Sequence, residues 1–318
     1  MFAHLTQLNV GSLFIALLVC FQLQAGEING FELSGALIPE DEILHGGPPK
    51  DGIPALNNPQ ITVAFQDTPL KKDDIVIGVS HGGISRAYPI RILNWHEVVN
   101  DRLDDLSIVV TYCPLCGSAV VFDAKVRGKT LQFGVSGLLY NSDVLLYDRS
   151  TSSLWSQLEG RAISGPYKGE KLVMLSSEHT TWEDWRKKKA HTSVISFDTG
   201  FARNYSRDPY QGYSNTKKLY FPVKFRAKGI HPKERVIGIQ LGNESKAWPF
   251  KDLHQTSNAI TDILGGEKIK IFFDKKSQSA QIRDVKGKLL PSTTLFWFAW
   301  SAFHPNTKIY RANSILID

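Results

Sequence analysis

The chain has 318 residues, of which 42% are hydrophobic, 21% charged and 11% aromatic. This composition is typical of a globular protein of about two domains, and it excludes a disordered chain, a collagen-like repeat and a polytopic membrane protein. The formal net charge of +6 is small and dispersed along the chain, so we expect no nucleic-acid partner.

The first 25 residues have the pattern of an export signal. Their apolar run covers 14 residues, 10–23, whereas a membrane-spanning helix needs roughly 20. Ala25 and Gly26 follow as small residues for cleavage, although no Lys or Arg precedes the run. We expect a cleaved signal peptide, a periplasmic or extracellular protein, and no transmembrane helix in the mature chain. The alternatives are an uncleaved anchor and a lipoprotein attached at Cys20.

Two stretches of the chain resemble each other at an offset of 160 residues. Residues 75–93 (IVIGVSHGGISRAYPIRIL) share glycine, proline and apolar positions with residues 235–253 (RVIGIQLGNESKAWPFKDL). We interpret them as two diverged copies of one unit. The predicted division of the chain is a signal peptide at 1–25, an N-terminal extension at 26–59, a first repeat unit at 60–123, a β-rich insert at 124–230 and a second, degenerate repeat unit at 231–318.

Hydrophobic alternation predicts the elements of the first copy. A strand at 75–79 turns through glycines into a strand at 85–90, a short helix is expected at 93–103, and strands at 107–112 and 119–123 form a hairpin. The insert alternates short strands with glycine turns before a short helix at 181–190. The predicted fold class is therefore β-dominated α+β, with few short helices and two related β-rich units on either side of a β-rich insert.

After removal of the signal, the chain has two cysteines, Cys113 and Cys116, in a Cys-Pro-Leu-Cys-Gly sequence between two strand-like runs. A thioredoxin-type pair opens a helix, but the residues after Cys116 favour a strand. A Cys-Pro-x-Cys-Gly turn between strands is similar to the metal knuckle of rubredoxin-like and zinc-ribbon sites. The second copy has Asp274 and Ser277 at the matching positions. The unit therefore does not need cysteines in order to fold, which favours a functional pair.

Three roles remain open for the two cysteines: a site for one transition-metal ion, zinc or copper, a redox-active dithiol, and a structural disulfide. A closed zinc site needs four ligands, and thiolates also suit copper(I). The candidates for additional ligands are His96, His81, Asp143 and Asp148. On the predicted helix, His96 and Asn100 share a face. His96 is then either a ligand or proton carrier beside the thiols, or a hydrogen-bonded histidine of the core.

Motifs on both sides of the cysteine pair support a family assignment. They are Arg86 to Pro89, His96 to Asp101, Tyr112 to Ser118, Phe133 to Leu138, Asn141 to Asp143, Tyr147 to Thr151, Ser153 to Gln157 and the loop Pro209 to Tyr213. Together they resemble the exported-protein family filed as domain of unknown function 3179. This resemblance implies an exported or surface-associated protein and names no activity.

Polar residues alternate with apolar ones along these motifs. We expect them to line a pocket that faces the cysteines, with Trp155 as a wall; the polar residues are Ser136, Asn141, Asp143, Asp148, Thr151 and Gln157. The alternative is that the aspartates and Thr151 only cap tight turns, as these residue types often do.

The predicted function is that of an exported protein in which Cys113 and Cys116 bind a metal ion or undergo thiol–disulfide chemistry. The alternative is a non-catalytic module that binds a ligand or partner and carries a structural disulfide. A hydrolase is a third hypothesis, because residues 134–137 begin like a nucleophile elbow. Leu138, however, stands where that motif requires glycine. No catalytic residue is assigned, and the partners and the question of enzymatic activity stay open.

Overall fold

The computed structural model describes residues 26–63 and 68–312. The expected export signal, residues 1–25, lies outside the described residues. Strands dominate the described part of the chain and its helices are few and short, which confirms the predicted β-dominated α+β fold. None of the described helices is long and apolar enough to cross a membrane.

The first unit, by which we mean residues 60–123 together with residues 178–195 that pair with them, contains a sheet with two long antiparallel strands at its centre. A third strand pairs antiparallel on one side, and a short strand pairs parallel on the other. A helix, α2 (Trp182–Lys188), connects these two outer strands and packs on the sheet. In spatial order the strands are β18 (Glu178–Thr181), β6 (Ile75–His81), β7 (Ile84–Pro89), β19 (Ser193–Ile195) and β5 (Ile61–Val63).

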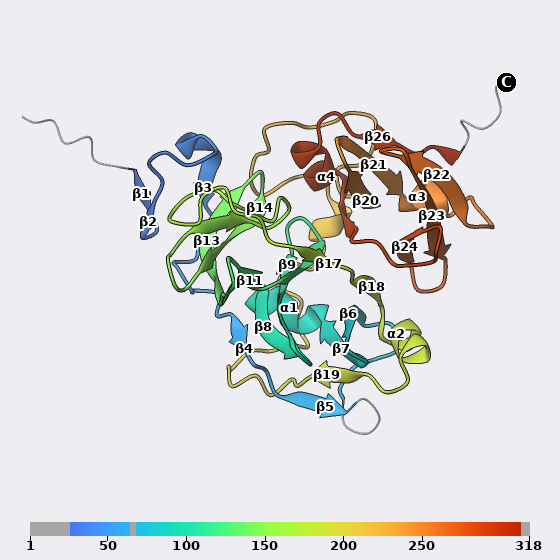
Figure 1. Ribbon diagram of the computed structural model, residues 1–318, viewed down its shortest axis with the longest axis horizontal. Coiled ribbons are helices and arrows are strands. Elements are labelled where there is room, and N and C mark those ends of the chain that lie inside the picture. The colour runs from blue at the N-terminus through green and yellow to red at the C-terminus, as the bar shows by residue number, and fades with distance from the viewer. Residues whose placement is uncertain (1–25, 64–67, 313–318) are drawn as a thin grey trace, which may run out of the picture.

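The second repeat unit, which we call the C-terminal unit, contains a sheet with the same arrangement of strands. Its central pair is again antiparallel, with an antiparallel strand on one side and a short parallel strand on the other. The helix α4 (Trp297–Phe303) again connects the outer strands. In spatial order the strands are β25 (Thr293–Phe296), β20 (Arg235–Leu241), β21 (Glu244–Pro249) and β26 (Lys308–Ile309). Figure 1 shows the two units at opposite ends of the molecule.

The two sheets also share one detail of packing. Trp185 of α2 lies over Gly78 of β6, and Trp300 of α4 lies over Gly238 of β20. A β-carbon at either glycine would overlap the indole ring. Glycine is therefore needed at both positions because a large side chain fills the space above the strand.

Each unit continues from its second central strand through a short helix into a three-stranded meander. The first unit has α1 (Ile90–His96), β8 (Val98–Leu103), β9 (Leu106–Cys113) and β10 (Ser118–Asp123), with β4 (Leu56–Asn57) and β17 (Met174–Leu175) at the sheet edges. The C-terminal unit has α3 (Phe250–Leu253), β22 (Ile260–Leu264), β23 (Glu267–Asp274) and β24 (Ser279–Asp284). Strand β10 lies against β25, and β24 lies against β18, so each meander packs on the sheet of the other unit.

The helix predicted at 93–103 is wrong in its second half. Helix α1 ends at His96 because Glu97 adopts a left-handed conformation, with φ of 56°. The chain then enters β8, whose first residues, Val98 and Val99, are β-branched and buried. His96 and Asn100 therefore do not share a helix face.

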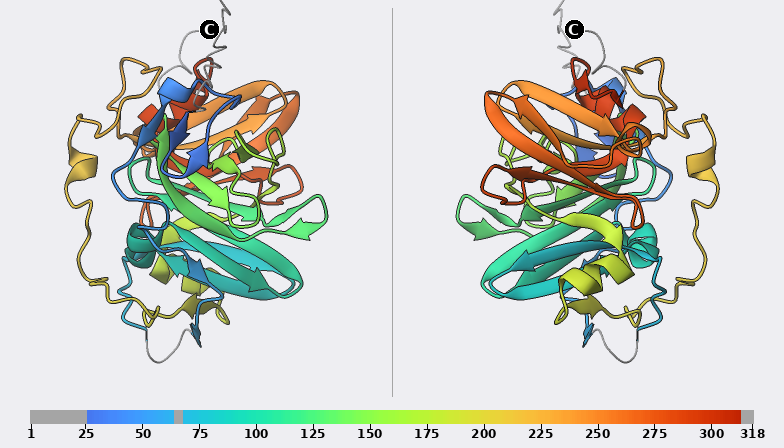
Figure 2. Two further views of the ribbon diagram at one scale, coloured as in Figure 1. Left: turned by 90° about the vertical axis from the view of Figure 1, so that its left-hand side faces the viewer. Right: turned by 90° about the vertical axis from the view of Figure 1, so that its right-hand side faces the viewer.

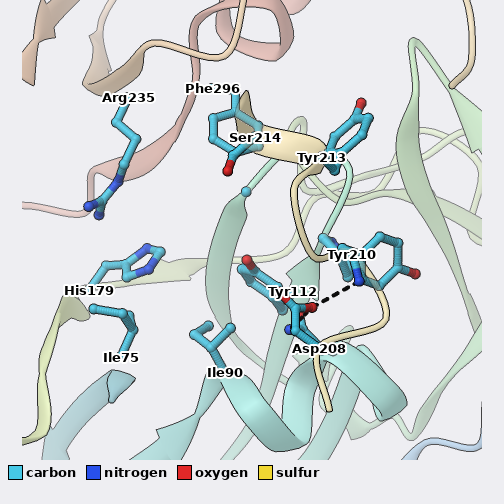
Figure 3. A pocket seen from close by; sticks show the side chains of 13 residues that line it. Ile75, Ile90, Tyr112, His179, Asp208, Tyr210, Tyr213, Ser214, Arg235 and Phe296 are labelled. Atoms are coloured by element: carbon cyan, nitrogen blue, oxygen red, sulfur yellow. Dashed lines mark hydrogen bonds between the residues drawn. The ribbon is translucent and has the colours of Figure 1, made fainter. Parts of the chain in front are cut away.

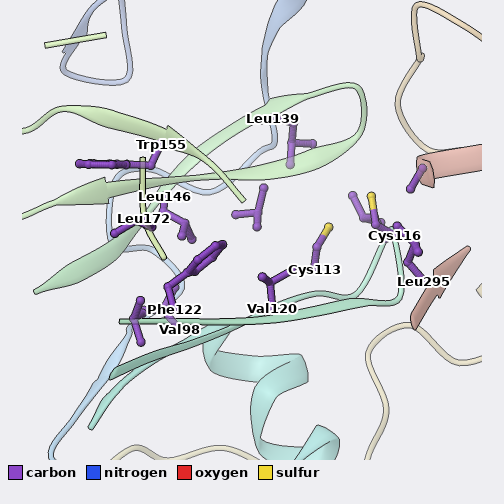
Figure 4. Close-up of a cluster of buried hydrophobic side chains, with 14 of the residues drawn as sticks. Val98, Cys113, Cys116, Val120, Phe122, Leu139, Leu146, Trp155, Leu172 and Leu295 are labelled. Atoms are coloured by element: carbon purple, nitrogen blue, oxygen red, sulfur yellow. The ribbon is translucent and has the colours of Figure 1, made fainter. Parts of the chain in front are cut away.

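A further sheet, which we call the insert sheet, covers the outer face of β8, β9 and β10. Val109 and Val120 of the meander belong to one buried cluster with Leu146 and Trp155 of the insert sheet (Figure 4). The cysteine-bearing strands are thus buried on both faces. In spatial order the insert sheet consists of β16 (Arg161–Ala162), β15 (Leu154–Ser156), β14 (Asp143–Asp148), β13 (Phe133–Tyr140) and β3 (Ile43–His45).

The connection at 196–234 runs along one side of the molecule from the first unit to the C-terminal unit (Figure 2). Its end is held by Lys233, whose Nζ donates to the carbonyls of Tyr213, at 2.6 Å, and Lys218, at 2.7 Å. The remaining elements are β1 (Glu27–Ile28), β2 (Phe31–Glu32), η1 (Glu40–Glu42), β11 (Lys125–Val126), β12 (Lys129–Thr130) and η2 (Tyr213–Asn215).

Candidate functional site

The two cysteines lie at the tip of the hairpin formed by β9 and β10, which we call the cysteine hairpin. Cys113 pairs with Ser118 across the hairpin, and Gly117 provides the left-handed residue of the turn, with φ of 61°. The carbonyl of Cys116 accepts a hydrogen bond from the backbone N–H of Phe296 at 2.8 Å, so β25 of the C-terminal unit holds the tip. Both side chains point toward the insert sheet (Figure 4).

The insert sheet brings Asp143 to the two cysteines. Asn141 and Ser142 both adopt left-handed conformations, with φ of 50° and 65°, and form the tight turn from β13 into β14. Asp143 is the first residue of β14. One carboxylate oxygen of Asp143 and the Sγ atoms of Cys113 and Cys116 lie within 4.8 Å of one another, and all three residues are buried. The turn that the sequence indicated therefore places a carboxylate at the thiols.

The Asp143 carboxylate has few hydrogen-bond partners for a buried charged group. Its Oδ2 accepts a hydrogen bond from the backbone N–H of Leu158 at 3.2 Å, whereas its buried Oδ1 has no hydrogen-bond partner within the described residues. No described Lys or Arg forms an ion pair with it. Burial raises the pKa of Asp143 to about 7, and hydrogen bonding from the backbone and from the thiols of Cys113 and Cys116 opposes this shift in part. A buried carboxylate without a cation is unfavourable for the fold, so the group is suited to receive one.

A second buried carboxyl group, that of Glu97, lies in the same region. Burial, together with the charge of Asp143, raises the pKa of Glu97 to about 8. Its backbone carbonyl accepts a hydrogen bond from the N–H of Tyr112 at 2.8 Å, which fixes it beside the cysteine hairpin. Glu97 is not among the site residues predicted from the sequence, although it directly follows His96 in a motif that also contains Asn100 and Asp101.

The thiols are shielded from solvent. Cys113 is 1% exposed and Cys116 is not exposed. Burial raises the pKa of both thiols, and the negative charge of Asp143 raises it further. The sulfurs of Cys116 and Cys113 lie 3.3 and 3.8 Å from the carbonyl oxygen of Ser142. A thiol that exchanges disulfides with a partner needs access and a lowered pKa, and this pair has neither.

Gln157 and Ser136 brace the site from the insert sheet. Gln157 Oε1 accepts from the hydroxyl of Ser118 at 2.7 Å, and its Nε2 donates to the hydroxyl of Thr111 at 3.0 Å. The hydroxyl of Ser136 donates to the carbonyl of Leu145 at a bulge between β13 and β14. Both side chains therefore position strands and do not point at the cysteines as ligands.

Three further residues of the predicted pocket have structural roles: Asp148 and Asn141 stabilise loops by hydrogen bonds, and Trp155 packs in the core. Asp148 accepts hydrogen bonds from the backbone N–H of Thr151 at 2.8 Å and from Trp155 Nε1 at 3.1 Å. Trp155 is fully buried, and Asn141 Oδ1 accepts from the backbone N–H of Lys224 at 2.8 Å. Of the two aspartates that the sequence placed near the cysteines, Asp143 joins them and Asp148 caps a turn.

The two candidate histidines have other partners. His96 is buried, with Nδ1 2.7 Å from the carbonyl of Pro54 and Nε2 2.6 Å from the hydroxyl of Tyr205. Both of its ring nitrogens are therefore engaged, as the core interpretation expects. His81 lies at the surface, where its Nε2 is 2.8 Å from Asp105. Neither histidine belongs to the group formed by the cysteines and Asp143.

The fold and this site define a β-rich protein of two sheet-and-meander units with a buried Cys-Cys-Asp group between a hairpin and the insert sheet. The model of the family described as "Protein of unknown function (DUF3179)" matches residues 50–307. The chain therefore belongs to this family, as its motifs predicted. No curated protein and no solved structure matches the chain.

Proposed function

We propose that this protein is an exported metal-binding protein in which Cys113, Cys116 and Asp143 hold one zinc ion. One observation carries the proposal: the Asp143 carboxylate is buried with an unpartnered oxygen and lies within 4.8 Å of two thiols. A cation at this point would satisfy that oxygen and convert three poorly solvated acidic groups into ligands.

The donor set favours zinc over copper. Zinc accepts cysteine sulfur and carboxylate oxygen in one tetrahedral site. Copper(I) selects soft sulfur ligands and gains little from a carboxylate. Three protein ligands leave a fourth position for a water molecule. Glu97 acts on Asp143 and Cys113 through its charge, but it lies outside the group whose ligand atoms are within 4.8 Å of one another.

Thiol–disulfide exchange is the less favoured function. The pair is buried from any partner protein, and the acidic groups around it oppose thiolate formation. A structural disulfide would leave Asp143 Oδ1 without a partner. Export, which rests on the apolar run at 10–23, fits a metal site because coordination would protect the thiols in an oxidising compartment.

The experiment is the native intact mass and metal content of the mature protein, isolated from its own compartment without added thiol. We expect one zinc per chain in the wild type and none in Cys113→Ser/Cys116→Ser or Asp143→Asn. Ser277→Ala, on the matching hairpin of the C-terminal unit, should keep the metal. A metal-free chain lighter than the dithiol form by about 2 Da would show a disulfide and contradict the proposal.

A further inference from the structure

A cavity of about 260 Å³ lies on the opposite face of the cysteine hairpin, between the two units and the 196–234 connection. Tyr112 of β9 forms part of its wall, while the neighbouring Cys113 points to the insert sheet. Ile75 and Ile90 of the first unit line it with Arg235 of the C-terminal unit (Figure 3). The cavity therefore forms only when the two units pack together.

One end of the cavity carries an arginine that forms no ion pair with the described residues. Arg235 begins β20, and its Nη1 donates to the backbone carbonyl of Gln278 at 3.2 Å. Its guanidinium also lies 4.6 Å from the ring centre of Phe250. The neighbouring Glu234, which accepts a hydrogen bond from the backbone N–H of Lys251 at 2.9 Å, acts on Arg235 through its charge but forms no ion pair with it, and desolvation lowers the pKa of Arg235. Such a cation is costly for the fold unless an anion joins it.

A histidine with a free ring nitrogen lies next to this arginine. His179, on β18, has a buried Nδ1 with no hydrogen-bond partner among the described residues. Burial and the positive charge of Arg235 lower its pKa to about 3, so its ring is neutral at physiological pH. Figure 3 shows the guanidinium and the imidazole side by side at the cavity. Together they offer one positive charge and several N–H donors.

The rest of the cavity is apolar, aromatic and, at the far end, acidic. Ile75 and Ile90 form the wall next to His179, and Tyr112 and Tyr210 lie across from Arg235 (Figure 3). Asp208 is held in place there, accepting a hydrogen bond from the backbone N–H of Tyr210 at 2.9 Å. A negative group is therefore favoured at the Arg235 end and disfavoured at the Asp208 end.

We propose that this cavity binds a small organic monocarboxylate, whose carboxylate sits on Arg235 and His179 and whose apolar or aromatic body lies against Ile75 and Ile90. A guanidinium matches a planar carboxylate in charge and geometry. A concave apolar site with few convergent polar groups is the usual form of a small-molecule site, and this volume suits a ligand below drug size. A phosphate dianion would meet only one positive charge here, with Asp208 opposite. The inference does not depend on the metal site.

Benzoate is the probe for this proposal, titrated into the full chain by calorimetry, with benzamide as its uncharged analogue and inorganic phosphate as the alternative anion. We expect saturable benzoate binding, at least tenfold weaker binding of benzamide, and no competition by phosphate. Arg235→Gln should weaken benzoate binding at least tenfold. Arg235→Lys, which keeps the charge but loses the planar pair of donors, should give an intermediate loss.

The matched control is Arg102→Gln, which removes an exposed arginine outside the cavity and should leave benzoate affinity unchanged. Circular dichroism establishes that each variant is folded. Three results would overturn the proposal: equal affinity for benzoate and benzamide, benzoate affinity that Arg235→Gln leaves intact, and displacement of benzoate by phosphate.

Discussion

The cysteine hairpin and the matching hairpin of the C-terminal unit have the same form and different surroundings. In the latter, Asp274 caps its own turn, with Oδ1 accepting from the backbone N–H groups of Lys276 at 2.8 Å and Ser277 at 2.7 Å. In the cysteine hairpin, Cys113 and Cys116 take these positions, and their side chains face another part of the protein. The shape of the hairpin alone therefore does not create a metal site.

The insert sheet causes this difference. Strand β23 buries Ile269 and Ile271 and exposes Lys270 and Phe272 between them, as a sheet with one solvated face does. Strand β9 is buried at every residue from Val109 on, because the insert sheet covers its second face. That cover excludes water from the thiols and also supplies Asp143. A metal site is therefore expected in the first unit only.

The largest contrast between the units concerns a buried ion pair. Arg86 donates to Asp101 at 2.6 Å, Tyr88 donates to the same oxygen at 2.7 Å, and the paired charged side chains are 9% and 6% exposed. Asp101→Asn should lower the free energy of unfolding by about 3–5 kcal/mol, because it leaves a buried arginine unpaired. Chemical denaturation measures this effect.

The control is Asp262→Asn, which breaks the pair formed by Lys246 and Asp262 in the C-terminal unit. These side chains are 18% and 15% exposed, so water can replace part of the interaction and the expected loss is about 1 kcal/mol. Equal losses in the two variants would contradict the difference in burial between the units.

The tryptophan-over-glycine packing should make the two units respond alike. Gly78→Ala and Gly238→Ala each place a methyl group against an indole ring, and each should cost about 1–3 kcal/mol. Denaturation of the two variants side by side measures this. A loss of stability in one variant and none in the other would show that the tryptophan and the glycine do not pack equally tightly in the two units.

The response of stability to acid tests the lowered pKa of His179. Because its folded pKa is lowered to about 3, the unfolded chain binds its proton first, and stability falls as the pH drops below about 6.5. Between pH 7 and 5.5 this residue should account for about 1 kcal/mol of the loss. His179→Gln should flatten the pH profile of unfolding by that amount, and an unchanged profile would contradict a neutral His179 ring in the folded protein.

The smallest effect is expected for the metal-free protein. Asp143→Asn removes a buried carboxylate whose pKa is raised to about 7, which favours the metal-free fold at pH 8. The amide that replaces it is also buried without full hydrogen bonding, which cancels most of this gain, so the expected net stabilisation is about 1 kcal/mol. Asp274→Asn, at an exposed turn, should change stability by less than about 0.5 kcal/mol. If Asp143→Asn destabilised the metal-free chain, the Asp143 carboxylate would stabilise the fold itself, which would contradict its assignment as a metal ligand.

The local parts of this structure could be predicted from the sequence. Alternation predicted the central strands of the first unit, the internal repeat indicated the same elements in the C-terminal unit, and the residues around Cys113 and Cys116 indicated a hairpin and not a helix. The helix expected through residue 103 failed because Glu97 turns left-handed and the valines after it pair with β9. Such pairing depends on the whole sheet, and no short window of sequence contains it.

The ligands of the candidate metal site could not be chosen from the sequence alone. The sequence offered His96, His81, Asp143 and Asp148 as further ligands without a means to choose among them. The choice of Asp143 depends on the turn before β14 and on the packing of the insert sheet over β9 and β10. The cavity at Arg235 could not be predicted at all, because its walls come from both units and the connection between them.

The most direct test of the central claim is X-ray absorption at the zinc edge of the purified protein. The proposed site predicts two sulfur neighbours at about 2.3 Å and oxygen neighbours at about 2.0–2.2 Å, with the sulfur shell lost in Cys113→Ser/Cys116→Ser. A zinc ion surrounded only by nitrogen and oxygen, unchanged in that double variant, would contradict the assignment of the metal to the cysteine hairpin.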